Sequence, residues 1–182
     1  MNLFSFAFVD PSMFFATMTL KYGRHFSDND QPRIETPFQD CQRIVLRGPA
    51  DGDWSADREQ ADYPFLAEWP SAGKLIEDVS KQIKMHLAAE NLQLGQVVVR
   101  SLAPSGVIGW HIEDTAYAMR HHRFVLLASP CAGGSWYSAG ESLAPGMGNL
   151  TYINHRVLHS YVNLGPVPQI SLIVDVRAPT LQ

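Results

Sequence analysis

After Leu94 the sequence breaks into short apolar segments, each closed by a turn that contains glycine or proline, and this pattern limits the possible folds most strongly. The expected strands are Gln96–Leu102, Val107–Glu113, His121–Leu127, Ser135–Ser138, Asn149–Asn154, His159–Asn163 and Gln169–Val176. The turns carry Pro104-Ser105-Gly106, Pro130 to Gly134, Pro145-Gly146 and Gly165-Pro166. Many short strands punctuated in this way indicate a β-sandwich or a β-barrel.

The first 94 residues are more mixed and contain one expected helix. Ser71 can cap a helix that runs to Glu90, because apolar residues recur within it at helical spacing. Strands are expected at Phe4–Val9 and Arg43–Arg47, with polar loops at 24–37 and 50–70.

Taken together, these segments predict a mainly β (α+β) protein. We expect a single domain over 1–182, in which 1–94 supplies supporting strands, a loop and an α-helix. Residues 95–177 are expected to form a double-stranded β-helix, the jelly-roll or cupin-like barrel, and to carry the metal site.

Composition excludes several classes of function. The net charge of −4 over 182 residues argues against a nucleic-acid surface, which needs clustered lysine and arginine. The two cysteines, Cys41 and Cys131, cannot form a disulfide framework, so a reducing, cytoplasmic location is expected. The apolar stretch 1–20 lacks a basic start and is interrupted by Asp10-Pro11, which favours packing strands over a signal peptide or membrane span.

One motif points to metal chemistry. His111 and Glu113 form an H-x-E pair, and alternation along a strand places both side chains on one face. His159, on a later expected strand, can complete a set of two histidines and one carboxylate. This set is the facial triad of non-haem Fe(II) oxygenases, which leaves coordination positions open for a co-substrate and O2.

Two of these ligand assignments have competitors. His155 competes with His159, but His155 lies in an Asn-His-Arg turn, whereas His159 begins a strand-like segment. Asp114 competes with Glu113, and it shares the face of His111 only if a β-bulge intervenes. We therefore predict His111, Glu113 and His159 as the metal-binding and catalytic residues.

Between about Gln39 and Arg177 the sequence resembles the aspartyl/asparaginyl β-hydroxylase family of Fe(II)/2-oxoglutarate-dependent dioxygenases. The resemblance is carried by Leu102–Gly106, His111–Glu113, Arg120–Leu127, Ala139–Glu141, His159–Asn163 and Ile170–Arg177. It implies a double-stranded β-helix that uses Fe(II), 2-oxoglutarate and O2. By the same match His111 and His159 are the iron histidines, and Arg120 and His122 fall beside the 2-oxoglutarate carboxylates.

The sequence departs from this family at Gln169. The family usually carries an arginine at this position, ten residues after His159, to pair with the distal carboxylate of 2-oxoglutarate. A glutamine at this cofactor-binding position can donate a hydrogen bond but supplies no charge. We expect Arg120 to supply the charge instead, with Arg100 and Arg177 as the alternatives.

The resulting hypothesis is a dioxygenase that hydroxylates an amino-acid side chain, in a small molecule or in a peptide, without a nucleic-acid or membrane partner. One alternative is a non-catalytic cupin-like module that binds a metal or a small molecule. Another is a barrel metalloenzyme that does not use 2-oxoglutarate. Barrels of this kind carry many functions, so the fold cannot decide between these hypotheses.

Overall fold

The computed structural model describes residues 2–14, 40–49, 65, 70–130 and 133–177. The loops expected at 24–37 and over most of 50–70 lie outside these residues, as does Cys131. Within the described ranges the elements are β1 (Leu3–Phe8), β2 (Cys41–Arg47), α2 (Pro70–Leu87), β3 (Gln93–Leu102), β4 (Val107–His111), α3 (Ala116–Arg120), β5 (His122–Leu127), β6 (Gly134–Ser138), β7 (Glu141–Leu143), β8 (Asn149–Ile153), β9 (His159–Asn163) and β10 (Gln169–Arg177).

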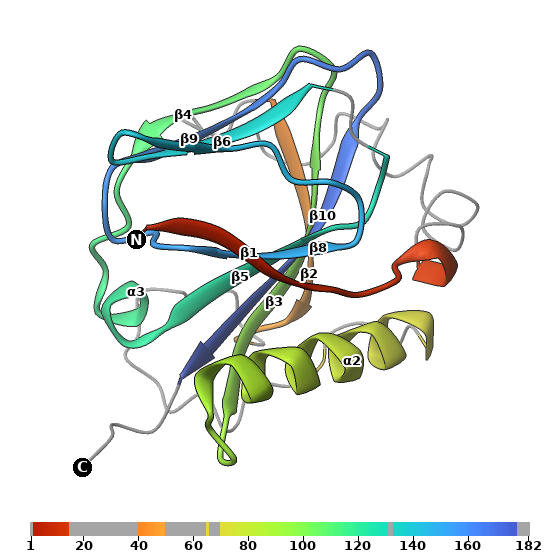
Figure 1. The fold of residues 1–182 in the computed structure, drawn as a ribbon, viewed down its shortest axis with the longest axis vertical. Coiled ribbons are helices and arrows are strands. Elements are labelled where there is room, and N and C mark those ends of the chain that lie inside the picture. The colour runs from red at the N-terminus through yellow and green to blue at the C-terminus, as the bar shows by residue number, and fades with distance from the viewer. Residues whose placement is uncertain (1, 15–39, 50–64, 66–69, 131–132, 178–182) are drawn as a thin grey trace.

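The strands form two antiparallel sheets that face one another (Figure 1). The major sheet has six strands in the order β1-β8-β5-β10-β3-β2, and the minor sheet has four in the order β4-β9-β6-β7. Helix α2 covers the outer face of the major sheet, on the side away from the minor sheet (Figure 1). This mainly β architecture confirms the predicted double-stranded β-helix with a supporting helix.

Strand alternation gives the major sheet two different faces. On the outer face, side chains such as Val97, Phe124 and Leu172 pack with the apolar stripe of α2, which includes Val79 and Ile83. On the inner face, apolar side chains pack against the minor sheet; these are Val98, Leu102, Val125 and Ile173. Polar and charged side chains, discussed below, are interspersed with them.

Most element boundaries lie close to those expected, and the differences have local causes. Helix α2 ends at Leu87 because Ala88 takes a positive φ of 49°. The Ala139-Gly140 turn, with φ of 47° and 84°, closes a tight β6–β7 hairpin, and β7 was not expected as a strand. None of the helices in the described part of the chain is long and apolar enough to cross a membrane.

Candidate metal centre

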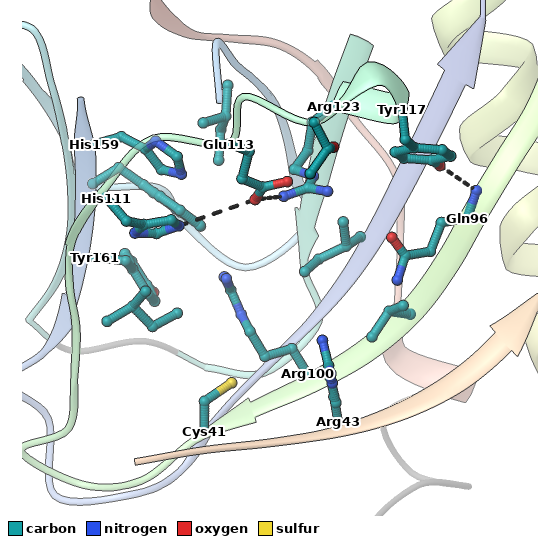
Figure 2. Close-up of a pocket in the computed structure, with 16 residues that line it drawn as sticks. Cys41, Arg43, Gln96, Arg100, His111, Glu113, Tyr117, Arg123, His159 and Tyr161 are labelled. Carbon is teal, nitrogen blue, oxygen red and sulfur yellow. Dashed lines mark hydrogen bonds and ion pairs between the residues drawn. The ribbon is translucent and has the colours of Figure 1, made fainter. Parts of the chain in front are cut away.

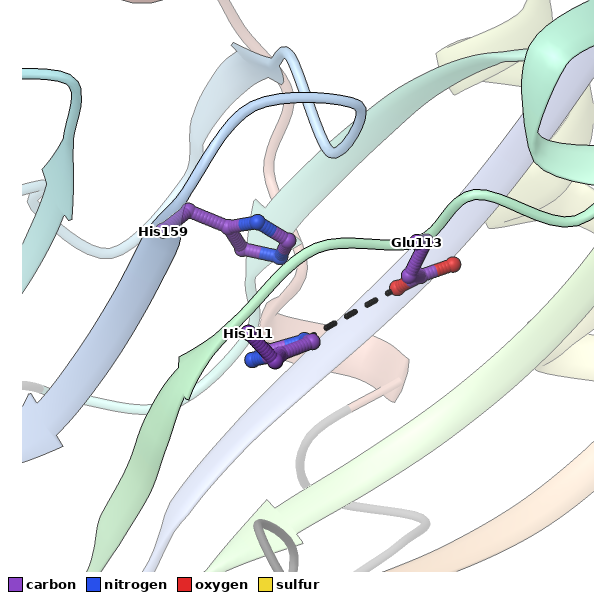
Figure 3. Close-up of side chains that lie close together, drawn as sticks. All are labelled: His111, Glu113 and His159. Atoms are coloured by element: carbon purple, nitrogen blue, oxygen red, sulfur yellow. Dashed lines mark ion pairs between the residues drawn. The ribbon is translucent and has the colours of Figure 1, made fainter.

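The two histidines of the predicted triad meet across the minor sheet. His111 ends β4, His159 begins β9, and the register of this antiparallel pair places them directly opposite one another. An irregularity between Ile108 and His111 sets this alignment. The imidazole centroids lie 4.1 Å apart, and both side chains face the space between the sheets (Figure 3).

Backbone carbonyls fix both imidazoles in the same way. Nδ1 of His111 lies 2.8 Å from the Gly109 oxygen, and Nδ1 of His159 lies 2.9 Å from the Val157 oxygen. A carbonyl oxygen can only accept, so in the neutral form of each ring Nδ1 carries the proton and the lone pair is on Nε2. Metal-binding histidines usually have this arrangement, in which an outer hydrogen bond fixes the ring and its tautomer.

Burial keeps His159 in the neutral form that a metal requires. The side chain is only 3% exposed, and burial lowers the pKa of His159 to about 4 from its ordinary 6.5. The imidazole is therefore uncharged at neutral pH and can offer its lone pair without first losing a proton.

Glu113 completes the cluster from the loop that follows β4. Its backbone N–H donates to the His155 oxygen at 3.0 Å, which anchors the loop. Its Oε1 lies 4.0 Å from Nε2 of His111, and the ligand atoms of Glu113 and the two histidines all lie within 4.8 Å of one another (Figure 3). Two nitrogens and one carboxylate oxygen form a donor set that suits Fe(II).

The two competing candidates, Asp114 and His155, are not part of this cluster. Asp114 is exposed. His155 is buried, but its Nε2 lies 3.0 Å from the Ala118 oxygen, so this ring ties the Glu113 loop to α3.

An arginine that the sequence analysis did not single out holds the carboxylate of Glu113. Arg123, on the inner face of β5, donates from Nη1 to Glu113 Oε1. Its Nε and Nη2 also donate to the two oxygens of Asp175 on β10, at 2.8 and 2.9 Å. Burial by itself raises the pKa of Asp175, but the charge and hydrogen bonds of Arg123 outweigh it, so the carboxyl stays ionised.

The Arg123–Asp175 pair had a signal in the sequence. Each residue is a charge within a strongly apolar strand, and a charge in such a strand is usually paired when the strand is buried. The two residues are direct neighbours in the β5–β10 register.

The structure does not bring Arg120 and His122 to this centre. The resemblance placed both beside the 2-oxoglutarate carboxylates, but Arg120 ends helix α3 and His122 begins β5. Thr115 starts this unexpected helix by accepting a hydrogen bond from the Ala118 N–H at 3.1 Å. Arg120 is exposed, and His122 lies on the outer face of β5 with its ring 6.1 Å from that of Tyr152.

Arg100, one of the two alternatives, lines the same cavity as the metal cluster. It lies on the inner face of β3, and its guanidinium stacks over Trp136 and Tyr161 at 4.9 and 5.5 Å. Only 7% of the residue is exposed, and its Nη2 has no hydrogen-bond partner among the described residues. Burial lowers the pKa of this guanidinium, because removal from water penalises its charged form.

Gln169 lies near Arg100 but has a different contact. It is buried at the start of β10, and the Tyr161 hydroxyl donates to its Oε1. In the register of the major sheet Gln169 pairs with Leu102, and Arg100 pairs with Ser171. The arginine thus reaches the same region of the inner face from the neighbouring strand. Arg177, the other alternative, does not line the cavity described next.

The metal cluster and Arg100 face one cavity of about 340 Å³ between the sheets (Figure 2). Its polar lining includes the three clustered residues, Arg100 and Arg123, with Arg43 and Gln96 further along the wall. Tyr117 packs closely above Gly95, where a Cβ atom would approach the tyrosine hydroxyl to 2.7 Å. The volume is that of a typical small-molecule site.

Comparison with known proteins gives the fold but no family. No protein-family model and no curated sequence matches this chain. The epimerase SnoN from nogalamycin biosynthesis, described as non-heme and alpha-ketoglutarate-dependent, superposes with a TM-score of 0.63 at 11% identity, over 98% of this chain and 78% of that one.

Two prolyl hydroxylases are also similar in structure. The collagen prolyl hydroxylase of Paramecium Bursaria Chlorella virus-1, in its 2OG complex, gives a TM-score of 0.59 at 11% identity, covering 98% of this chain and 97% of the other. The Pseudomonas putida prolyl-4-hydroxylase gives 0.59 at 13% identity, covering 98% and 93%. At these identities the likeness establishes the double-stranded β-helix fold that 2-oxoglutarate/Fe(II) oxygenases have.

Proposed function

We propose that the protein is an Fe(II)/2-oxoglutarate-dependent oxygenase. One observation supports this most directly: a cluster of two histidines and a carboxylate shares a single cavity with a buried arginine whose Nη2 has no protein partner. A metal site explains the cluster, and an anion that reaches both the metal and the arginine explains the cavity between them. 2-Oxoglutarate has a carboxylate at each end and fits this arrangement.

Each residue then has a defined task. His111, Glu113 and His159 hold Fe(II), and Arg123 with Asp175 orients the Glu113 carboxylate. Arg100 pairs with the distal carboxylate of 2-oxoglutarate, because position 169 has a glutamine where the family usually has an arginine. The rings of Tyr161 and Trp136 stack against the Arg100 guanidinium and shield it from water. When bound, the metal and co-substrate supply the oxidising chemistry that activates O2.

The hydroxylation of an amino-acid side chain, and the aspartyl/asparaginyl β-hydroxylase subfamily, are proposed from the sequence resemblance. The structural neighbours share the fold and support the wider class of oxygenase. A non-catalytic metal-binding module would have the same histidines. It differs from the enzyme because it does not need Arg100 to bind a co-substrate.

The test is the conversion of 2-oxoglutarate to succinate by Fe(II)-loaded protein, with and without a panel of amino acids and peptides. We expect slow succinate formation without substrate, faster formation with a substrate, and a product heavier by one oxygen. His159→Ala and Arg100→Gln should abolish or strongly reduce turnover, while Arg177→Gln, an arginine outside the cavity, should leave it unchanged. Stoichiometric metal binding without any succinate would contradict the proposal and favour the binding module.

A further inference from the structure

A third arginine of the cavity lining, Arg43, faces the cavity from the edge of the major sheet. It lies on β2 between Cys41 and Val45, whose side chains pack on the inter-sheet core, so alternation turns Arg43 to the same inner face. Arg43 is one of the residues that line the cavity (Figure 2). Because it is also exposed, it lies where the cavity meets solvent.

Arg43 and Arg100 are direct cross-strand neighbours. In the β2–β3 register Arg43 is paired with Arg100, and Figure 2 shows both side chains extending from the cavity floor. Like charges at directly opposite positions destabilise a sheet. Among the residues that the structure describes, Arg43 has no hydrogen bond or ion pair that offsets this repulsion.

The cavity wall lacks the negative charge that two arginines need. Among the described residues that line it, Glu113 is the single acid, and Arg123 already holds its carboxylate. The chain as a whole is negative, with a net charge of −4, so the paired arginines are a local concentration of positive charge. A concave site of one sign attracts and retains ligands of the opposite sign.

The proposed co-substrate accounts for one of these arginines. If 2-oxoglutarate directs one carboxylate to the metal and the other to Arg100, its two charges are matched by two partners. Arg43 is then left facing the unfilled, open part of the cavity, where a second molecule has to enter. A second anion would balance its charge.

We propose that Arg43 binds a carboxylate of the substrate, so that the substrate class is a small acid-bearing molecule. This inference rests on the proposed function, because it assigns Arg100 to 2-oxoglutarate. The shared chemistry is a carboxylate, whether the α-carboxylate of an amino acid or the side chain of an aspartyl or glutamyl residue. Charge-assisted and bidentate pairing by arginine gives such a site geometric selectivity.

The experiment measures binding by calorimetry to protein loaded with Zn(II), which cannot turn over, and N-oxalylglycine, an unreactive analogue of 2-oxoglutarate. N-oxalylglycine is titrated first. The filled protein then receives three probe sets: N-acetyl amino acids with a free α-carboxylate, N-acetyl aspartyl and glutamyl amides with a side-chain carboxylate, and neutral N-acetyl amides. The variants are Arg43→Gln, Arg43→Lys and the control Arg120→Gln, an exposed arginine outside the cavity.

We expect wild type to bind at least one set of acids about tenfold or more tightly than the neutral amides, the usual effect of a charged hydrogen bond. Arg43→Gln should remove this preference, Arg43→Lys should keep part of it, and Arg120→Gln should keep all of it. The affinity for N-oxalylglycine should change less than about threefold in each variant.

Three results would overturn the inference while leaving the proposed function standing. In the first, N-oxalylglycine binds but none of the acid probes does. In the second, acids and amides bind wild type equally. In the third, Arg43→Gln weakens N-oxalylglycine as much as it weakens the probes, which would make Arg43 a second co-substrate residue. Failure of N-oxalylglycine to bind wild type would instead contradict the proposed function, and this inference with it.

Discussion

The two faces of the major sheet are built from the same strands and have opposite character. On the outer face, β3, β5 and β10 present mainly apolar side chains to α2, with Phe124 and Leu172 fully buried. On the inner face the same three strands carry Arg100, Arg123 and Asp175 among their apolar residues. Because side chains alternate, a fold can devote one face to stability and the other to chemistry without a separate structural element.

This difference predicts that substitutions on the two faces impair different properties of the protein. A change on the outer face should lower the free energy of unfolding and leave the affinities of the folded protein intact. A change in the metal cluster or at Arg100 should remove binding and leave a folded protein.

The largest effect is expected at the metal. His159→Ala should abolish stoichiometric binding of Fe(II) or Zn(II), since a site with only two protein ligands binds weakly. The measurement is metal content after dialysis against a weak chelator. His155→Gln is the matched control and should retain the metal. The reverse result, with loss in His155→Gln alone, would show that the distal ligand is wrongly assigned.

The next effect is expected at the co-substrate. Arg100→Gln should raise the Kd of 2-oxoglutarate about a hundredfold or more, because a desolvated charge pair typically costs about 3–5 kcal/mol to break. Anaerobic calorimetry on the Fe(II)-loaded protein measures this Kd. Gln169→Arg tests whether an arginine on β10 can replace the arginine on β3. In the Arg100→Gln background it should recover part of the lost affinity for 2-oxoglutarate. An unchanged Kd in Arg100→Gln would remove this arginine from the site.

On the outer face, Phe124→Ala should lower the free energy of unfolding by about 3–5 kcal/mol, because it empties a fully buried position beneath α2. Urea denaturation of the metal-free protein measures the loss. Met119→Ala, at an exposed side chain, should change stability by about 0.5 kcal/mol or less. Loss of metal affinity in folded Phe124→Ala would show that the two faces are not independent.

The pKa of His159 predicts an acid-sensitive contribution to stability. Its folded pKa of about 4 lies below the ordinary 6.5, so the unfolded chain takes up a proton that the folded protein resists. This contribution is complete above pH 6.5 and is lost as the pH falls toward 4, by roughly 3 kcal/mol. Urea titrations of metal-free protein should therefore show a shallower acid loss for His159→Gln. An identical pH profile in the variant would contradict the burial argument.

The smallest effect is expected at the carboxylate. Glu113→Ala should weaken metal binding by about tenfold or more without abolishing it, because a water oxygen can take the place of the carboxylate oxygen but not of an imidazole nitrogen. Asp114→Ala should have little effect. Competition with a chromophoric chelator measures both constants. Equal affinities in wild type and Glu113→Ala would mean that water takes the third position.

How far the sequence predicts this site depends on what alternation can resolve. The H-x-E spacing and the later strand at His159 suffice to bring three donors together, and Glu113 joins them although β4 ends at His111. Alternation could not choose Arg100 in advance, because both sides of β3 carry valines, Val97 and Val99 on one and Val98 on the other, so the apolar pattern does not say which side faces the minor sheet. The position of Arg120 was not predicted because no helix was expected between Glu113 and His121, and the Thr115 cap starts one there that carries Arg120 to the surface.

If the metal cluster and Arg100 act on one ligand, the binding of 2-oxoglutarate must depend on both the metal and the arginine. Anaerobic calorimetry compares the metal-free and Fe(II)-loaded forms of wild type and Arg100→Gln. We expect one 2-oxoglutarate per chain in Fe(II)-loaded wild type, with much weaker binding when either the metal or the guanidinium is removed. Tight binding that is indifferent to the metal, or no binding to the Fe(II)-loaded protein, would contradict it.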